Sequence, residues 1–229
     1  MVNKDYILRL AEHFGRALAI IIGLRQRNQF EESLYAIDEM LLRTTGFTSG
    51  LINTTSEEML LNLLAPLGKL NVEKCLWIIV LLNEEGESYL ALERPDDGYY
   101  RYLKSLNLTL ELLLRGYDVR DIELVAFAET LLDKLADYEI PAQTREKLSQ
   151  CYEQAGWYAR AEDVLFEMIE DESIPDDETR YIATYGKAFY QRLLGKSDAD
   201  LQAGNLSRAE VQEGLTALEK IASARNLDK

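Results

Sequence analysis

Apolar residues recur at intervals of three and four along most of the chain. One stripe consists of Ala161, Val164, Leu165, Met168 and Ile169, and a second consists of Val211, Leu215, Leu218 and Ala222. These intervals place the apolar side chains on one face of a helix. No run of alternating β-branched residues bounded by turn signals indicates a strand. The sequence therefore predicts an all-α fold.

Prolines and capping signals divide this pattern into separate helices. Thr55 with Glu58 and Ser207 with Glu210 have the spacing of a capping box, and Asn71 stands before another apolar run. We expect loops at 46–54, 96–98 and 198–205. Ten helices are predicted, over 4–26, 31–43, 56–65, 72–92, 99–115, 119–137, 142–155, 158–172, 177–195 and 207–225.

Two of these helices carry apolar residues on more than one face. Residues 75–82 are apolar on every side, and the helix over 119–137 is apolar on two faces. Such helices lie between layers of other helices. Because the loops are short and none has the composition of a disordered linker, we expect a single domain over residues 1–229.

One segment resembles the core of a tetratricopeptide repeat across its helix–turn–helix. The residues that carry the resemblance are Leu148, Tyr152, Gly156, Tyr158, Ala161, Leu165 and Met168. Gly156 permits a tight turn between the helices, Tyr158 fills the space above it, and Ala161 is small enough for the helices to approach closely. A weaker copy has Leu24, Asn28, Phe30, Ile37 and Met40 at corresponding spacings. The resemblance implies antiparallel helix pairs stacked in a short, irregular tetratricopeptide-like array.

The start of the chain is also similar to an uncharacterised bacterial family of tetratricopeptide-like proteins. The similarity lies in residues 5–9, Asp-Tyr-Ile-Leu-Arg, and residues 15–19, Gly-Arg-Ala-Leu-Ala. It implies a helical fold and a cytoplasmic location. That family has no established activity, so the resemblance supplies no catalytic residues.

The charge balance argues against several classes of partner. The chain has 25 basic and 40 acidic residues, a net charge of −15, which should repel nucleic acid and anionic membranes. Residues 1–27 are an exception, with five basic residues against two acidic ones. The start lacks the apolar core of a secretory signal, and no apolar run is long enough to cross a bilayer. We therefore expect a cytoplasmic protein.

The sequence offers little for catalysis. His13 is the single histidine, and Cys75 and Cys151 are expected to be reduced core residues. The segment 194–197, Leu-Gly-Lys-Ser, resembles the end of a phosphate-binding loop but lacks its first glycine, and residues 198–209 lack the glycine and glutamate of a calcium loop. We expect no enzyme, no metal and no cofactor.

Two groups of residues are candidates for partner binding. Arg9, His13 and Arg16 share one helix face, which is either simply solvated or a site for an anion or an acidic partner. The other group is a dense aromatic patch of Tyr99, Tyr100 and Tyr102, which would anchor an interface or pack in part into the core.

These observations favour a non-catalytic module that binds a protein, a helix or a second copy of itself. The negative charge favours a partner with basic segments, and a homodimer could form if the basic N-terminal helix docks on an acidic surface. The alternative is a small-molecule sensor or an unrecognised enzyme with a pocket that the sequence does not reveal.

Overall fold

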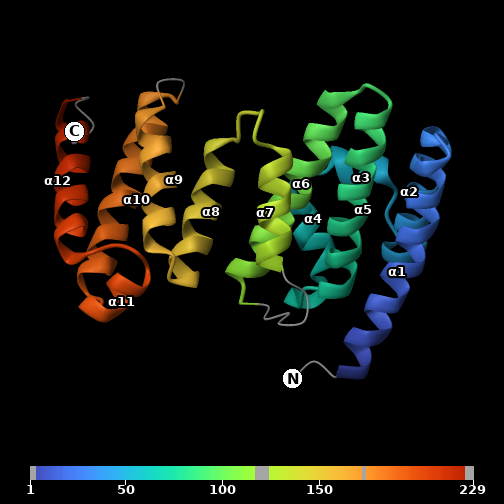
Figure 1. The fold of residues 1–229 in the computed structure, drawn as a ribbon, viewed down its shortest axis with the longest axis horizontal. Helices are drawn as coiled ribbons and strands as arrows, with labels where there is room; N and C mark the ends of the chain where they lie inside the picture. Colours follow the sequence, from blue (N-terminus) through green and yellow to red (C-terminus); the bar gives the residue numbers. More distant parts are fainter. Residues whose placement is uncertain (1–3, 117–123, 172–173, 225–229) are drawn as a thin grey trace. The chain divides into compact units, whose positions relative to one another are not determined.

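The computed structural model describes residues 4–116, 124–171 and 174–224, and it describes the side chains of these residues from residue 12 onward except residues 176 and 224. Within these residues it has twelve α-helices, one short 3-10 helix and no strand (Figure 1), which confirms the all-α prediction. The chain divides into two compact units, Met1–Glu139 and Ile140–Lys229, called here the N-terminal and C-terminal units. The expectation of a single domain stays a prediction, and each unit is described by itself.

The N-terminal unit is built around one central helix, α5. Its elements are α1 (Lys4–Gln26), α2 (Phe30–Thr45), α3 (Ser49–Thr54), α4 (Glu57–Leu64), η1 (Pro66–Gly68), α5 (Val72–Ala91), α6 (Pro95–Leu114) and α7 (Leu124–Lys134). Helix α5 packs against α1, α2, α4 and α6. Its residues 75–82 are buried on almost every side, as their continuous apolar run predicts.

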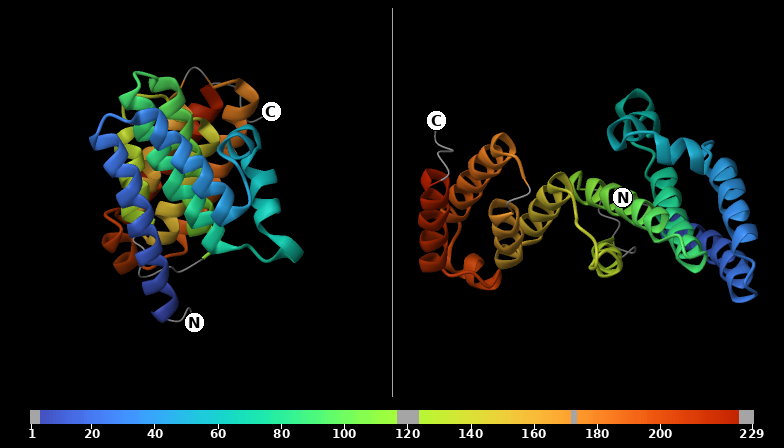
Figure 2. Two further views of the ribbon diagram at one scale, coloured as in Figure 1. Left: turned by 90° about the vertical axis from the view of Figure 1, so that its right-hand side faces the viewer. Right: turned by 90° about the horizontal axis from the view of Figure 1, so that it is seen from above.

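Helices α1 and α2 form a hairpin (Figure 2) whose turn depends on one asparagine. Asn28 has φ 58°, in the left-handed region that asparagine tolerates better than most residues. The reversal packs Ala17 and Ile21 of α1 into the same core as Ile37 and Leu41 of α2.

In the C-terminal unit, successive helices pack side by side and alternate in direction (Figure 1). The elements are α8 (Ala142–Ala155), α9 (Tyr158–Glu170), α10 (Asp176–Leu194), α11 (Asp198–Ala203) and α12 (Arg208–Ala224). Gly156 ends α8 with φ 79°, so the predicted tight turn is present. The six other residues of the predicted repeat core are buried: Leu148, Tyr152, Tyr158, Ala161, Leu165 and Met168.

Three stretches predicted as loops contain helix, so these predictions were wrong. Residues 96–98 form the first turn of α6, where Pro95 supplies a preset φ and the two aspartates favour the helix start. Residues 49–54 form α3, and residues 198–203 form α11. Thr48 and Ser197 cap these two helices by accepting hydrogen bonds from backbone N–H groups.

Two of the three predicted helix caps are present in the structure. Ser207 and Glu210 form the expected reciprocal pair, in which Ser207 N donates to Glu210 Oε2 at 2.7 Å, and Asn71 caps α5. Helix α4 is capped by Ser56 and not by Thr55 as predicted, because Met59 N donates to Ser56 Oγ. Thr55 instead donates its hydroxyl to the carbonyl of Leu51 in α3.

Candidate functional site

An open groove in the N-terminal unit lies where α1, α2 and α5 meet. Its volume is about 340 Å³, and we call it the basic groove after its three basic side chains. It is lined by His13, Arg16, Ala17, Ile20, Met40, Arg43, Thr44 and Trp77. Phe14 of α1 supports the floor from the side, with its ring 4.2 Å from that of Trp77. Ala17, Met40 and Trp77 are buried, so the floor is apolar and fixed by the core.

The rim of the basic groove carries basic side chains with no carboxylate partner among the described residues of the unit. His13, Arg16 and Arg43 are exposed, and Arg16 reaches only the backbone carbonyl of Glu12 at 3.4 Å. No carboxylate lies within ion-pair distance of these three side chains in the described part of the chain. Other arginines do pair with a carboxylate there: Arg25, Arg94, Arg101, Arg115, Arg145, Arg192 and Arg208.

The predicted basic face is therefore seen in part. His13 and Arg16 lie together at the groove, as their spacing on one helix indicates. The side chain of Arg9 lies outside the described residues. Arg43 and Trp77 were not singled out from the sequence, because they come from α2 and α5 and no local pattern links them to His13.

Two of the three tyrosines in the predicted patch lie together, with the rings of Tyr99 and Tyr100 5.1 Å apart, and the third does not join them. Tyr99 stacks on Tyr138 and donates to the carbonyl of Glu139, and Tyr100 is 61% exposed. Tyr102 is 1% exposed, so its proposed place at a partner surface was wrong. Its Oη donates to Glu87 Oε1 at 2.8 Å, and burial, followed by this bond, raises its pKa far above the usual value.

A second polar site, which the sequence analysis missed, lies inside the N-terminal unit. Three buried or half-buried carboxylates of α5 pair with cations from three other helices: Glu84 with Arg25 at 2.7 Å, Glu85 with Arg101 at 3.3 Å, and Glu87 with Lys134 at 2.7 Å. We call these the α5 ion pairs. The signal in the sequence is a polar stretch, 83–88, that continues a fully buried helix.

Hydroxyl groups tie the same stretch of α5 to two further helices. Ser33 of α2 donates to Ser88, and Ser49 of α3 donates to Glu85 Oε1 at 2.6 Å. Burial alone would raise the pKa of Glu87, but hydrogen bonds from Lys134 and Tyr102 hold it below its usual value. Since each of the three carboxylates has a cation beside it, the arrangement is suited to fixing helix positions.

A comparison with models of protein families found a match over nearly the whole chain. The matching model covers residues 1–223. The chain belongs to the family of unknown function DUF6483. No curated protein and no solved structure matches it. The DUF6483 match includes every helix that lines the basic groove and every helix that contributes to the α5 ion pairs.

Metal ligands and reactive thiols are two further features that could support chemistry in this DUF6483 protein. No cluster of three or more histidine, cysteine, aspartate or glutamate side chains suited to a metal ion occurs among the described residues. Cys75 and Cys151 form no disulfide. Burial raises the pKa of Cys75 to about 12, which keeps this thiol protonated and unreactive at neutral pH. Within the same residues, no helix is both long and apolar enough to span a membrane.

The C-terminal unit of the DUF6483 protein has its own half-buried carboxylate. Tyr190 Oη donates to Glu162 Oε1 at 2.5 Å. Burial raises the pKa of Glu162, although the bond from Tyr190 opposes that shift. A Cβ on Gly214 would lie 2.3 Å from Tyr190 Oη, so the backbone of α12 closes one side of this pair.

Proposed function

We propose that this member of DUF6483 is a non-catalytic protein-interaction module that binds a helix or peptide in the basic groove. The observation that carries the proposal is a set of three basic side chains around an apolar floor, none of them within ion-pair distance of a carboxylate among the described residues. A solvated helix face would explain exposed arginines, but it would not explain why cations from two helices meet over a buried tryptophan.

The lining of the groove favours an amphipathic partner with acidic residues. Met40 and Trp77 would contact an apolar anchor, which is where interfaces concentrate their binding energy. His13, Arg16 and Arg43 would orient carboxylates of the partner and increase the association rate. This local preference is opposite to the one derived from the net charge of −15, which concerns the rest of the surface.

We further propose that the stacked pairs α8–α9 and α10–α12 belong to a short tetratricopeptide-like array. The left-handed turn at Gly156 and the burial of Ala161 between neighbouring helices support this view. The cytoplasmic location implied by the family resemblance stays a prediction.

Selection from a library of helical peptides displayed on phage would test the groove. The chain has two tryptophans, so Trp157→Phe leaves Trp77 as the single fluorescent reporter. We expect the selected peptides to combine apolar anchors with glutamate or aspartate, to shift the emission of Trp77, and to bind Arg16→Gln/Arg43→Gln about tenfold more weakly or worse.

The control is Arg94→Gln/Lys196→Gln, which removes two exposed cations outside the groove and should leave binding unchanged. Selected peptides that bind the groove variant as tightly as the parent would contradict the proposal. If only small organic anions shifted the emission of Trp77, the sensor alternative would replace it, because about 340 Å³ lies within the range of small-ligand pockets.

A further inference from the structure

The N-terminal unit also presents a ridge of exposed apolar side chains. Met59 and Leu63 of α4 are 60% and 49% exposed, and Leu67 of η1 is 105% exposed. The spacing of four between these positions places the first two on one helix face. On the opposite face of α4, Leu60, Leu61 and Leu64 are buried, so the ridge is not needed for the core.

The backbone at the tip of the ridge is strained. Leu67 has φ 60° and ψ 28°, and Gly68 follows with φ 77°. Residues with a Cβ other than asparagine and aspartate adopt this left-handed region rarely. Leu67 buries none of its side chain within the unit that would offset the strain, and strain without local compensation is a feature of binding segments.

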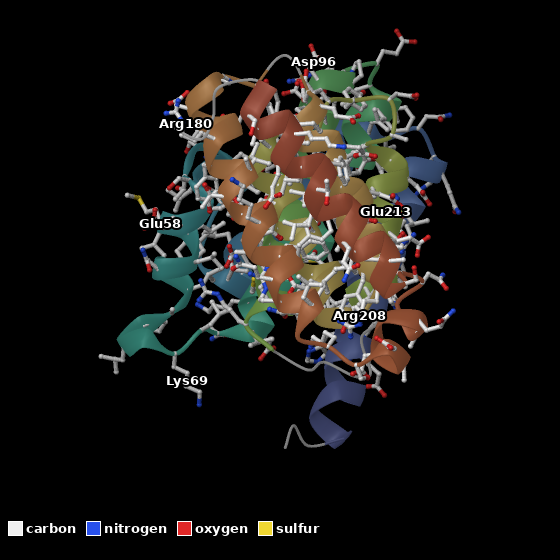
Figure 3. The ribbon with its side chains drawn as sticks, turned by 90° about the vertical axis from the view of Figure 1, so that its left-hand side faces the viewer. Glu58, Lys69, Asp96, Arg180, Arg208 and Glu213 are labelled. Atoms are coloured by element: carbon white, nitrogen blue, oxygen red, sulfur yellow. The ribbon has the colours of Figure 1, made fainter. Side chains whose placement is uncertain are left out.

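The ridge stands out from the helices around it. Figure 2 shows α4 and η1 projecting away from α5 and α6, and Figure 3 shows Glu58 and Lys69 on the projecting segment. A projecting row of largely exposed apolar side chains is the kind of feature that marks an interaction site.

The charges beside the ridge complement those of the basic groove. Glu57 and Glu58 begin α4 one turn or less from Met59, whereas His13 and Arg43 lie on the groove rim. Ridge and groove thus carry opposite charges beside apolar surface, as two surfaces that dock on one another do.

We infer that the ridge formed by Met59, Leu63 and Leu67 of one copy docks into the basic groove of a second copy of this chain. This inference rests on the proposed function and names its partner. The apolar side chains would cover the floor at Trp77, and Glu58 would approach the arginines of the rim. In a two-fold arrangement each copy contributes one ridge and one groove, which doubles the contact.

A membrane surface is a less suitable occupant for the same ridge. An exposed leucine beside Lys69 could insert into lipid, but Glu57 and Glu58 lie next to the ridge and the chain carries a net charge of −15. Both would be repelled by an anionic leaflet. The groove of a second copy has the opposite charge.

Sedimentation velocity of the full chain would test the inference with two variants. Leu63→Asp/Leu67→Asp alters the ridge, and Arg16→Glu/Arg43→Glu alters the groove. We expect the wild type to self-associate with a micromolar dissociation constant, and each variant alone to associate about tenfold more weakly or worse. An equimolar mixture should regain a complex, because an intact ridge then meets an intact groove.

A matched control replaces exposed apolar residues outside both surfaces. Tyr35→Asp/Leu90→Asp adds the same charge as the ridge variant and should leave self-association unchanged. Circular dichroism and thermal unfolding of each variant would establish that the monomers are folded, since all the altered side chains are exposed or half-exposed.

A synthetic peptide of residues 55–70 separates this inference from the proposed function. With Trp157→Phe in the ridge variant, the peptide should shift the emission of Trp77, and the groove variant should not respond. A monomeric wild type at high micromolar concentration, or a mixture that forms no complex, would overturn the inference. If library peptides still bound the groove in that case, the proposed function would stand without it.

Discussion

The two units rely to different degrees on ion pairs and on close contacts at glycine to fix the positions of their helices. In the N-terminal unit, Glu84, Glu85 and Glu87 of α5 are held by cations from α1, α6 and α7. In the C-terminal unit, glycines bring helices together. A Cβ on Gly186, Gly204 or Gly214 would lie within 2.9 Å of a neighbouring side chain.

This difference shows which kind of substitution each unit tolerates. A buried ion pair is directional and depends on every member, because removing one charge leaves the other without compensation. A close contact at glycine depends on the absence of volume. The N-terminal unit also has a close contact at a glycine, because Gly86 lies against the ring of Tyr102.

The largest effect is expected from removing a carboxylate of the α5 ion pairs. Glu85→Leu would leave Arg101 and the hydroxyl of Ser49 without their partner in a buried position. We expect a loss of about 3–5 kcal/mol in the free energy of unfolding, measured by urea denaturation. Glu213→Leu, on an exposed position of α12 (Figure 3), should change it by about 0.5 kcal/mol or less.

If Glu85→Leu unfolded like the wild type, the ion pairs would not hold the N-terminal unit. The double variant Glu85→Leu/Arg101→Met refines the test. Because it removes both charges together, we expect it to be more stable than the single variant.

Added volume should act most strongly in the C-terminal unit. Gly204→Ala would place a Cβ 2.3 Å from the ring of Tyr158 and 2.6 Å from the carbonyl oxygen of Gly156. We expect a loss of about 1–3 kcal/mol in thermal unfolding experiments. The control is Gly50→Ala in α3, where nothing lies within 4 Å, and a gain of about 0.5–1 kcal/mol is expected there. Equal effects of the two substitutions would argue against the close contact.

Removing the hydroxyl of Tyr190 should have a smaller effect. Tyr190→Phe deletes the bond to Glu162, a half-exposed carboxylate. We expect a loss of about 1 kcal/mol. Since this bond lowers the pKa of Glu162 against the effect of burial, the pKa should rise further in the variant. Carboxyl ¹³C NMR titration would measure it, with Tyr181→Phe as a control at an exposed tyrosine.

The carboxylates of the two units should respond to acid in opposite ways. The pKa of Glu87 lies below its ordinary value of 4.5 in the folded state, so its contribution is present above pH 4.5 and is lost as the pH falls through the folded value. The pKa of Glu162 is raised, so its cost is present above the folded value and is relieved as the pH falls toward 4.5.

Unfolding experiments on Glu87→Gln and Glu162→Gln between pH 3 and 7 would compare these slopes. With falling pH, the stability advantage of the wild type over Glu87→Gln should shrink. Over the same range, any disadvantage of the wild type relative to Glu162→Gln should also shrink. Parallel curves for both variants would contradict the proposed electrostatic difference.

The smallest effect concerns the strained backbone of the ridge. Leu67→Asn replaces an exposed leucine with φ 60° by a residue that tolerates this conformation. We expect a gain of about 1 kcal/mol or less in stability together with weaker self-association. Leu63→Asn, in a regular helix, should weaken association without any gain in stability. A loss of stability in Leu67→Asn would show that the leucine has a structural role.

Periodicity in the sequence predicted the long helices well, because a stripe needs several turns to be visible. The six-residue helices α3 and α11 are too short to show one. The tyrosine patch is divided for a geometric reason. Tyr99 and Tyr100 remain in ring contact, but Tyr100 and Tyr102 are two positions apart, and about 100° of rotation per residue places them on nearly opposite sides of α6.

The functional surfaces were less predictable than the helices. His13 and Arg16 share a turn and could be grouped by spacing, whereas Arg43 and Trp77 reach the basic groove from other helices. Arg25 and Glu84 are 59 positions apart, so no local pattern relates them. The ridge could not be predicted from the sequence either, because its exposure depends on which face of α4 packs against the core.

The placement of the two cysteines makes the chain its own reporter of local unfolding. Cys75 is fully buried in the N-terminal unit, and Cys151 is half-buried in the C-terminal unit. A thiol reagent can reach the buried sulfur of Cys75 only when its surroundings open, and partial burial should slow the labelling of Cys151, so each labelling rate reports on the opening of its own unit. If denaturant changed both labelling rates equally, the units would open in one cooperative event. If it changed them differently, each unit would open alone.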